Sequence, residues 1–130
     1  MIAVDTNVLA RIAAADEPKQ LAAALALFAE HPVFIPKTVL LEAEWVLRAI
    51  YLKSTRDIAR YFAGLLEAEN VSIEDEAGVA SAVEWLAAGM DFADAVHLAS
   101  SARATAFYTF DDKLRRRARR AKGAPKVAVP

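Results

Sequence analysis

The sequence contains no cysteine and only two histidines among its 130 residues. The lack of cysteine excludes a disulfide framework and any metal site built on thiolates. It also suits a reducing compartment, and we expect the protein to be cytoplasmic.

Long apolar runs are also lacking. No stretch reaches the roughly 18–20 apolar residues that a membrane-spanning helix needs, so we expect no membrane association. The N-terminus has neither a basic segment nor a small-residue cleavage site, which predicts that there is no signal peptide. Repeats, low-complexity tracts and linkers are missing too, and the length predicts a single domain over residues 1–130.

The net charge of −1 hides an uneven distribution. Residues 113–122 carry seven basic side chains and no acidic one. The rest of the chain therefore has nine basic residues and all seventeen acidic ones. The sequence predicts an acidic body with one strongly basic helix near its C-terminal end.

Short apolar runs alternate with helical patterns along the chain. The patterns predict strands at residues 2–4, 33–35, 71–73, 106–108 and 126–129. They predict helices at about residues 18–29, 37–51, 54 onward, 76–88, 91–103 and from 111 or 112 onward. Buried strands that alternate with helices indicate an α/β fold, with three layers (α/β/α), a short central parallel sheet and many helices.

Two acidic residues directly follow predicted strands. Asp5 comes after residues 2–4, and Asp111 comes shortly after residues 106–108. In open α/β sheets, ligands bind beyond the carboxyl ends of the strands, so both side chains are placed for a functional role. Aspartate is also a preferred helix N-cap, and this structural interpretation stays open for each of them.

Glu42 lies in a segment that is apolar on nearly every side, and none of its neighbours three or four positions away is a cation. Glu44 has Arg48 four positions later, which predicts an ordinary surface ion pair. A glutamate buried without a partner would be costly, and a bound cation would remove that cost. We therefore single out Glu42, and not Glu44, as a candidate metal ligand.

A fourth candidate lies in the segment DFADA at residues 91–95. Asp91 is well placed as an N-cap, which is a sufficient structural explanation for it. Asp94 is surrounded by apolar residues, and its nearest ionisable neighbours are Asp91 and His97. Asp94 therefore joins Asp5, Glu42 and Asp111 in a set of four carboxylates with hardly a local cation among them.

Carboxylates of this kind would repel one another if the fold brought them together. Hard divalent cations prefer oxygen ligands, so the set predicts Mg²⁺ or Mn²⁺, whereas zinc is disfavoured without cysteine and with one histidine in reach. A metal held in this way suits the hydrolysis of a phosphodiester bond.

These motifs, in this order, resemble those of PIN-domain proteins, and specifically the VapC-type toxin ribonucleases of toxin–antitoxin pairs. The resemblance rests on IAVDTNVL at residues 2–9, VLLE running into EWVL at 39–47, DFADA at 91–95 and TFD at 109–111. It spans nearly the whole chain, and it implies a Mg²⁺- or Mn²⁺-dependent endoribonuclease. It also implies a homodimer and a VapB-type antitoxin whose C-terminal segment covers the acidic groove.

The resemblance further implies which residues form the site. Asp5, Glu42, Asp94 and Asp111 would be the catalytic and metal-binding carboxylates, and Asn7 and Thr109 would be polar groups that support them. Asp112 is an alternative fourth acid. We prefer Asp111 because it keeps the spacing from Thr109, and because Asp112 has arginines three and four positions later.

The basic helix has two open interpretations. It could bind RNA phosphates, with Arg115, Arg116 and Arg119 nearest the substrate, or it could be a solvated surface. Trp45 and Trp85 lie in apolar helical stretches, which favours core or interface packing over base stacking.

Two other functions fit the sequence less well than the nuclease does. A haloacid-dehalogenase-like phosphatase also begins with a strand followed by Asp, but it needs an Asp where this chain has Asn7. A non-catalytic regulatory module of the receiver type needs an acceptor Asp after a middle strand, where this chain has Glu74.

Overall fold

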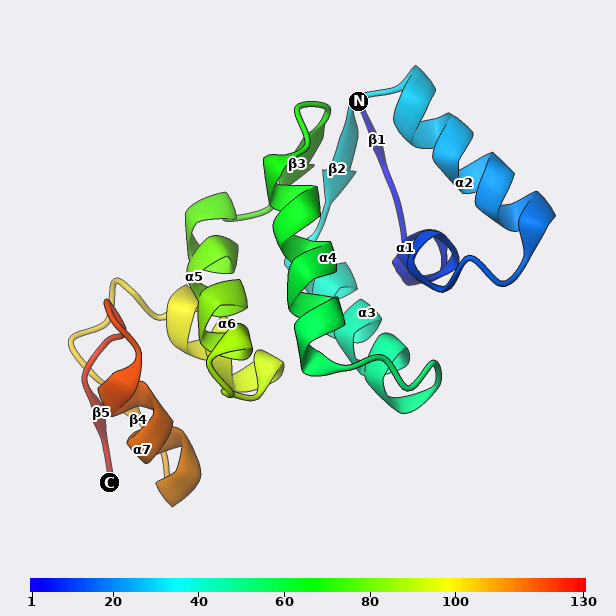
Figure 1. The fold of residues 1–130 in the computed structure, drawn as a ribbon. Coiled ribbons are helices and arrows are strands. Elements are labelled where there is room, and N and C mark those ends of the chain that lie inside the picture. Colours follow the sequence, from blue (N-terminus) through cyan, green and yellow to red (C-terminus); the bar gives the residue numbers. More distant parts are fainter. The chain divides into compact units, whose positions relative to one another are not determined.

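The computed structural model describes all residues from 1 to 130 (Figure 1). The chain forms two compact units, Met1–Glu76 and Ala77–Pro130. Both combine helices with parallel strands, so the predicted α/β class is confirmed. No helix is both long and apolar enough to cross a membrane.

The first unit is built on a parallel sheet with the strand order β1-β2-β3. Ile2 is in register with Val33, and Val33 is in register with Val71. The strands are β1 (Ile2–Ala3), β2 (Val33–Ile35) and β3 (Val71–Ile73). The helices are α1 (Thr6–Ala14), α2 (Pro18–Glu30), α3 (Lys37–Ala49) and α4 (Thr55–Glu67).

Local sequence signals explain where these helices begin. Pro18 occupies the first turn of α2, where its missing N–H has no hydrogen bond to lose. Ser54 accepts a hydrogen bond from the backbone N–H of Asp57 at 3.1 Å and so caps α4, as the sequence predicted.

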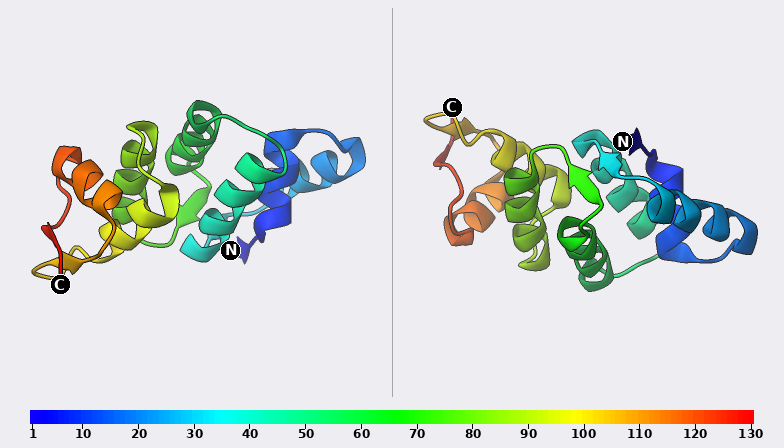
Figure 2. Two further views of the ribbon diagram at one scale, coloured as in Figure 1. Left: turned by 90° about the horizontal axis from the view of Figure 1, so that it is seen from below. Right: turned by 90° about the horizontal axis from the view of Figure 1, so that it is seen from above.

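Helix α1 packs against both α2 and α3 (Figure 2). The largest fully buried side chains of this unit are apolar and come from the sheet and from α1, α3 and α4: Leu9, Val33, Ile35, Leu40, Leu47, Ile58 and Phe62. This core holds the end of β1, and therefore Asp5, in a defined position.

The second unit pairs two short parallel strands, β4 (Phe107–Tyr108) and β5 (Val127–Ala128). Its helices are α5 (Glu76–Ala87), α6 (Phe92–Ser100) and α7 (Asp112–Arg120). The predicted strands are thus all present, and they form one three-stranded and one two-stranded sheet.

Helix α5 ends in a Schellman motif. Gly89 has a φ of 107°, its N–H bonds to the carbonyl of Leu86, and the N–H of Met90 bonds to the carbonyl of Trp85, both at 2.9 Å. This turn leads the chain directly into Asp91 and α6. Trp85 itself is 5% exposed, which confirms that it is a core residue.

Candidate active site

Asp5 lies at the carboxyl end of β1 and is the N-cap of α1. Its Oδ1 accepts a hydrogen bond from the backbone N–H of Val8 at 3.2 Å. The side chain is exposed, and no other hydrogen bond or ion pair uses its carboxylate. The capping interpretation is therefore correct for Asp5, and it leaves the second oxygen free to bind a ligand.

The expected environments of the two glutamates on α3 are reversed in the structure. Glu42 is exposed and has no ion pair, whereas Glu44 is only 8% exposed. The pair of Glu44 with Arg48 forms, at 2.7 Å from Arg48 Nε, and Arg48 also donates to Thr55 Oγ1 at 2.9 Å. The prediction of an ion pair is confirmed, but the prediction that it lies on the surface is wrong for Glu44.

Helical periodicity explains this reversal. The buried residues of α3 are Leu40, Ala43, Glu44 and Leu47, which follow the i, i+3, i+4, i+7 spacing of one helix face. Glu44 belongs to that face, and a residue two positions earlier lies on the other side of the helix. The sequence contains this spacing. It does not stand out there, because apolar residues also lie on both sides of Glu42. Because Glu42 is exposed, the argument from burial does not support a metal there. Glu42 stays a candidate ligand because it has no cation partner and because it lies in the motif.

Trp45 shows the same effect. It follows Glu44 directly, and it is 60% exposed. The expectation of a core position is wrong for this tryptophan, and the expectation of an interface position stays a prediction.

In the second unit, Asp91 and Asp94 begin α6. The N–H of Asp94 donates to Asp91 Oδ2 at 3.0 Å, so Asp91 is the predicted N-cap. Burial raises the pKa of Asp94, and the charges of Asp91 and Asp111 raise it further, while His97 and Lys113 lower it. Asp94 and Asp111 are thus brought within electrostatic reach of each other, although they are distant in sequence.

Asp111 caps α7. Its Oδ1 accepts hydrogen bonds from the N–H groups of Lys113 at 2.9 Å and Leu114 at 3.1 Å. Its own N–H donates to Thr109 Oγ1 at 3.0 Å, so Thr109 orients the backbone that carries Asp111. Asp112 instead pairs with Arg115, as its spacing predicted. Asp111, and not Asp112, is therefore the N-cap of α7, and the choice of Asp111 as the fourth acid of the site stays a prediction.

The motifs on this framework can be compared with known proteins. The family model of the PIN domain matches residues 2–120. The chain belongs to the PIN-domain family. This confirms the family that the motifs resembled, and all four candidate carboxylates lie within the matched residues. The PIN and VapC proteins are nucleases.

A solved structure similar to this PIN domain is that of VapC20 from Mycobacterium tuberculosis, which is described as a toxin that cleaves the sarcin–ricin loop. The two chains are 25% identical, the similarity covers 88% of this chain and 92% of that one, and the TM-score is 0.46. No curated protein matches the sequence.

The candidate ligands are divided between the units of this PIN domain. Asp5 and Glu42 belong to the first unit, and Asp94 and Asp111 belong to the second. Within each unit, no three histidine or acidic side chains converge so as to hold a metal ion. The donor set nevertheless fits a hard cation, because the carboxylates of Asp5, Glu42 and Asp94 form no ion pair and offer oxygen ligands.

The remaining predicted residues differ in their surroundings. Asn7 is exposed on α1, and its side chain has no hydrogen bond. Arg115 is half-buried and pairs with Asp112, whereas Arg116 and Arg119 are exposed and have no ion pair. Lys113, whose charge acts on Asp94, was not singled out from the sequence, because its proximity to Asp94 arises from the packing of α6 and α7.

Proposed function

We propose that this PIN domain is a Mg²⁺- or Mn²⁺-dependent endoribonuclease and the toxin of a VapC-type toxin–antitoxin pair. Membership of a nuclease family supports a nuclease, and the order of the four motifs supports the VapC type. We take residues 1–130 as one functional domain, because the matched residues run through both compact units.

One observation carries the assignment of the site. Four acidic residues of the chain form ion pairs, and none of them is a proposed ligand: Asp16, Glu44, Asp75 and Asp112. The four carboxylates of the motifs are thus among the thirteen acidic residues that form no ion pair, and their place in the motifs distinguishes them from the other nine. This is the expected arrangement if Asp5, Glu42, Asp94 and Asp111 together bind a divalent ion.

When bound, Mg²⁺ or Mn²⁺ would lower the pKa of a coordinated water and offset the negative charge that builds on the phosphate. The protein's own residues have separate tasks. Asp5 and Asp111 each use one oxygen to cap a helix, which fixes the carboxylate and leaves the other oxygen free. Thr109 orients Asp111 through its hydrogen bond, and the unbonded amide of Asn7 is available to position a substrate phosphate.

We further propose the partners that the VapC type implies. These are an RNA substrate, a VapB-type antitoxin whose C-terminal segment covers the acidic site, and a second copy of the chain in a homodimer. Exposed apolar side chains near the end of α3 would suit such contacts: Trp45, Ile50 and Leu52. A cytoplasmic location belongs to the same proposal.

The test is RNA cleavage by the purified protein with Mg²⁺, with Mn²⁺ and with a chelator, beside the Asp5→Asn variant. Asparagine caps helices about as well as aspartate does, so this variant removes the charge and keeps the start of α1. We expect cleavage only when both the metal and Asp5 are present. Full activity of Asp5→Asn, or activity that persists in the chelator, would disprove the assignment.

A further inference from the structure

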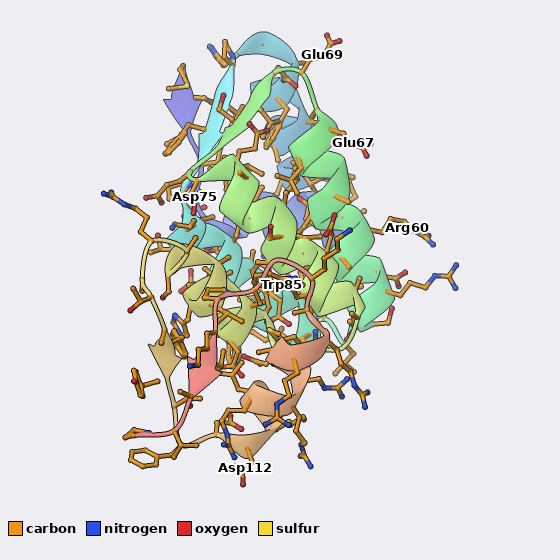
Figure 3. The ribbon with its side chains drawn as sticks, turned by 90° about the vertical axis from the view of Figure 1, so that its left-hand side faces the viewer. Arg60, Glu67, Glu69, Asp75, Trp85 and Asp112 are labelled. Atoms are coloured by element: carbon orange, nitrogen blue, oxygen red, sulfur yellow. The ribbon has the colours of Figure 1, made fainter.

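Helix α7 is surrounded by nitrogen-tipped side chains, which Figure 3 shows around the helix that begins at the labelled Asp112. Of the seven cations at residues 113–122, only Arg115 forms an ion pair. Like charges at this density repel one another, and no acidic side chain of the protein pairs with the other six. Such a surface favours an anion.

Part of this surface is hollowed into a pocket of about 320 Å³. Arg115 and Arg119 of α7 and Lys126, which directly precedes β5, contribute its three charged side chains, and no carboxylate lines it. Alanine, proline and valine side chains make up the rest of its wall. All lining residues belong to the second unit.

Arg115 gives a second, independent indication. Its Nε is buried and has no hydrogen-bond acceptor, although its Nη2 pairs with Asp112. A guanidinium presents five N–H donors in a planar fork, and in Arg115 one of them, Nε, is both buried and without an acceptor. Buried donors without acceptors are rare in folded proteins, and they point to a missing ligand or water.

We propose that this pocket of Arg115, Arg119 and Lys126 binds a backbone phosphate of the RNA. The proposal rests on the proposed ribonuclease function, because that function supplies the polyanion. Guanidinium groups match the geometry of phosphate oxygens, and Lys126 adds a point charge. Arg115 and Arg119 lie within the residues that the family model matches, and Lys126 lies beyond them.

Only some of the arginines of α7 line this pocket. Arg115 and Arg119 line it, whereas Arg116 is exposed and does not. The sequence suggested all three as RNA-binding residues, and the structure selects two of them and adds Lys126. Arg116 therefore provides an internal control of equal charge on the same helix.

The experiment measures RNA binding without cleavage. A fluorescein-labelled single-stranded RNA is titrated with the protein in a chelator, and fluorescence anisotropy gives the affinity at several salt concentrations. Each phosphate contact to a single strand contributes about 0.7 to the slope of log K against log salt. The double variant Arg119→Gln/Lys126→Gln removes the contact with one phosphate and should therefore lower the slope by about 0.7. Both side chains are exposed, so the substitutions leave the core intact.

The matched control is Arg116→Gln/Arg120→Gln, which removes two exposed charges from the same helix but none from this pocket. We expect its slope to stay close to that of the wild type. Equal losses in the two double variants would show a diffuse positive field and overturn the proposal, as would an unchanged slope for Arg119→Gln/Lys126→Gln.

A calorimetric titration with inorganic phosphate separates RNA from small anions. We expect phosphate to compete with RNA and to bind the Arg119→Gln/Lys126→Gln variant less tightly. If that variant loses phosphate binding but keeps the RNA slope, the pocket is a small-anion site and the proposal for RNA is wrong. Because no step here requires catalysis, this failure is distinguishable from that of the metal-dependent cleavage assay.

Discussion

Asp111 has a measurable structural role and a proposed catalytic role, and two substitutions separate them. Its Oδ1 accepts two backbone N–H groups at the start of α7. Asp111→Asn keeps an oxygen in this position, whereas Asp111→Ala removes it. Replacing a capping residue with alanine costs about 0.5–2 kcal/mol, and asparagine is about as good a cap as aspartate.

Two smaller effects change the expected stability of Asp111→Asn in opposite directions. Losing a negative charge at a helix N-terminus costs about 0.3–1 kcal/mol. Removing the repulsion of Asp111 on Asp94 offsets part of that loss. We therefore expect Asp111→Asn to be within about 0.5 kcal/mol of the wild type, and Asp111→Ala to be destabilised by about 1–2 kcal/mol. For a chain of this length, 1 kcal/mol corresponds to a melting-temperature shift of about 3–5 °C.

Thermal unfolding in a chelator measures these stabilities, and metal-dependent RNA cleavage measures the function. Supporting residues around metal ligands typically contribute about 10–100-fold to activity, so both variants of a direct ligand should lose at least about 100-fold. The decisive variant is Asp111→Asn, because it should be stable and inactive.

Two matched variants serve as controls. Asp91 caps α6 through one backbone hydrogen bond from Asp94, and Asp112 is the neighbouring aspartate that pairs with Arg115. Asp91→Asn and Asp112→Asn should both keep most of the activity. If Asp111→Asn stays active while only Asp111→Ala loses activity in proportion to its lost stability, Asp111 is a helix cap and nothing more.

Two further predictions concern charge and burial. Burial and the charges of Asp91 and Asp111 raise the pKa of Asp94 in the folded state. The contribution of Asp94 to the free energy of unfolding is therefore present at low pH, and it is lost as the pH rises through the pKa that Asp94 has in the folded protein. Asp94→Asn should thus stabilise the metal-free protein in urea unfolding more at pH 7 than at about pH 4.5, and a gain that is equal or larger at the lower pH would contradict this reasoning. Arg48→Ala leaves the buried carboxylate of Glu44 without its partner, and because the Arg48 side chain is 43% exposed, water can replace part of the interaction. We expect a loss of about 1 kcal/mol in urea unfolding that Arg48→Ala/Glu44→Gln partly restores; wild-type stability of the single variant would refute it.

The starts of α2 and α4 and the end of α5 could be predicted because they are encoded locally. Pro18 begins α2, Ser54 caps α4, and Gly89 ends α5 with a left-handed turn. Each of these signals acts within one helical turn, so it does not depend on the rest of the fold. The same is true of the ion pairs of Glu44 and Asp112, whose partners are three or four positions away.

Interactions between distant segments could not be predicted in the same way. The proximity of Asp94 to Asp111 and Lys113 depends on how α6 and α7 pack, and the pocket of Arg115, Arg119 and Lys126 depends on the pairing of β4 with β5. The position of Glu44 is an intermediate case. Its burial follows from a spacing that the sequence contains, but choosing the buried face of α3 requires knowing which helices and strands cover it.

The capping role of Asp5 and Asp111 supports the proposed site, although the two interpretations first look like alternatives. A carboxylate has two oxygens and accepts several hydrogen bonds, so capping occupies only part of its capacity. In both residues the cap bonds use Oδ1, and no protein group bonds to Oδ2. The cap fixes the rotamer of the side chain at the end of a strand, which is the preorganisation that a metal ligand needs. A ligand held by the backbone in this way retains its geometry when the metal leaves, so capping is a physical reason to expect aspartate at these two positions of the proposed metal-dependent nuclease.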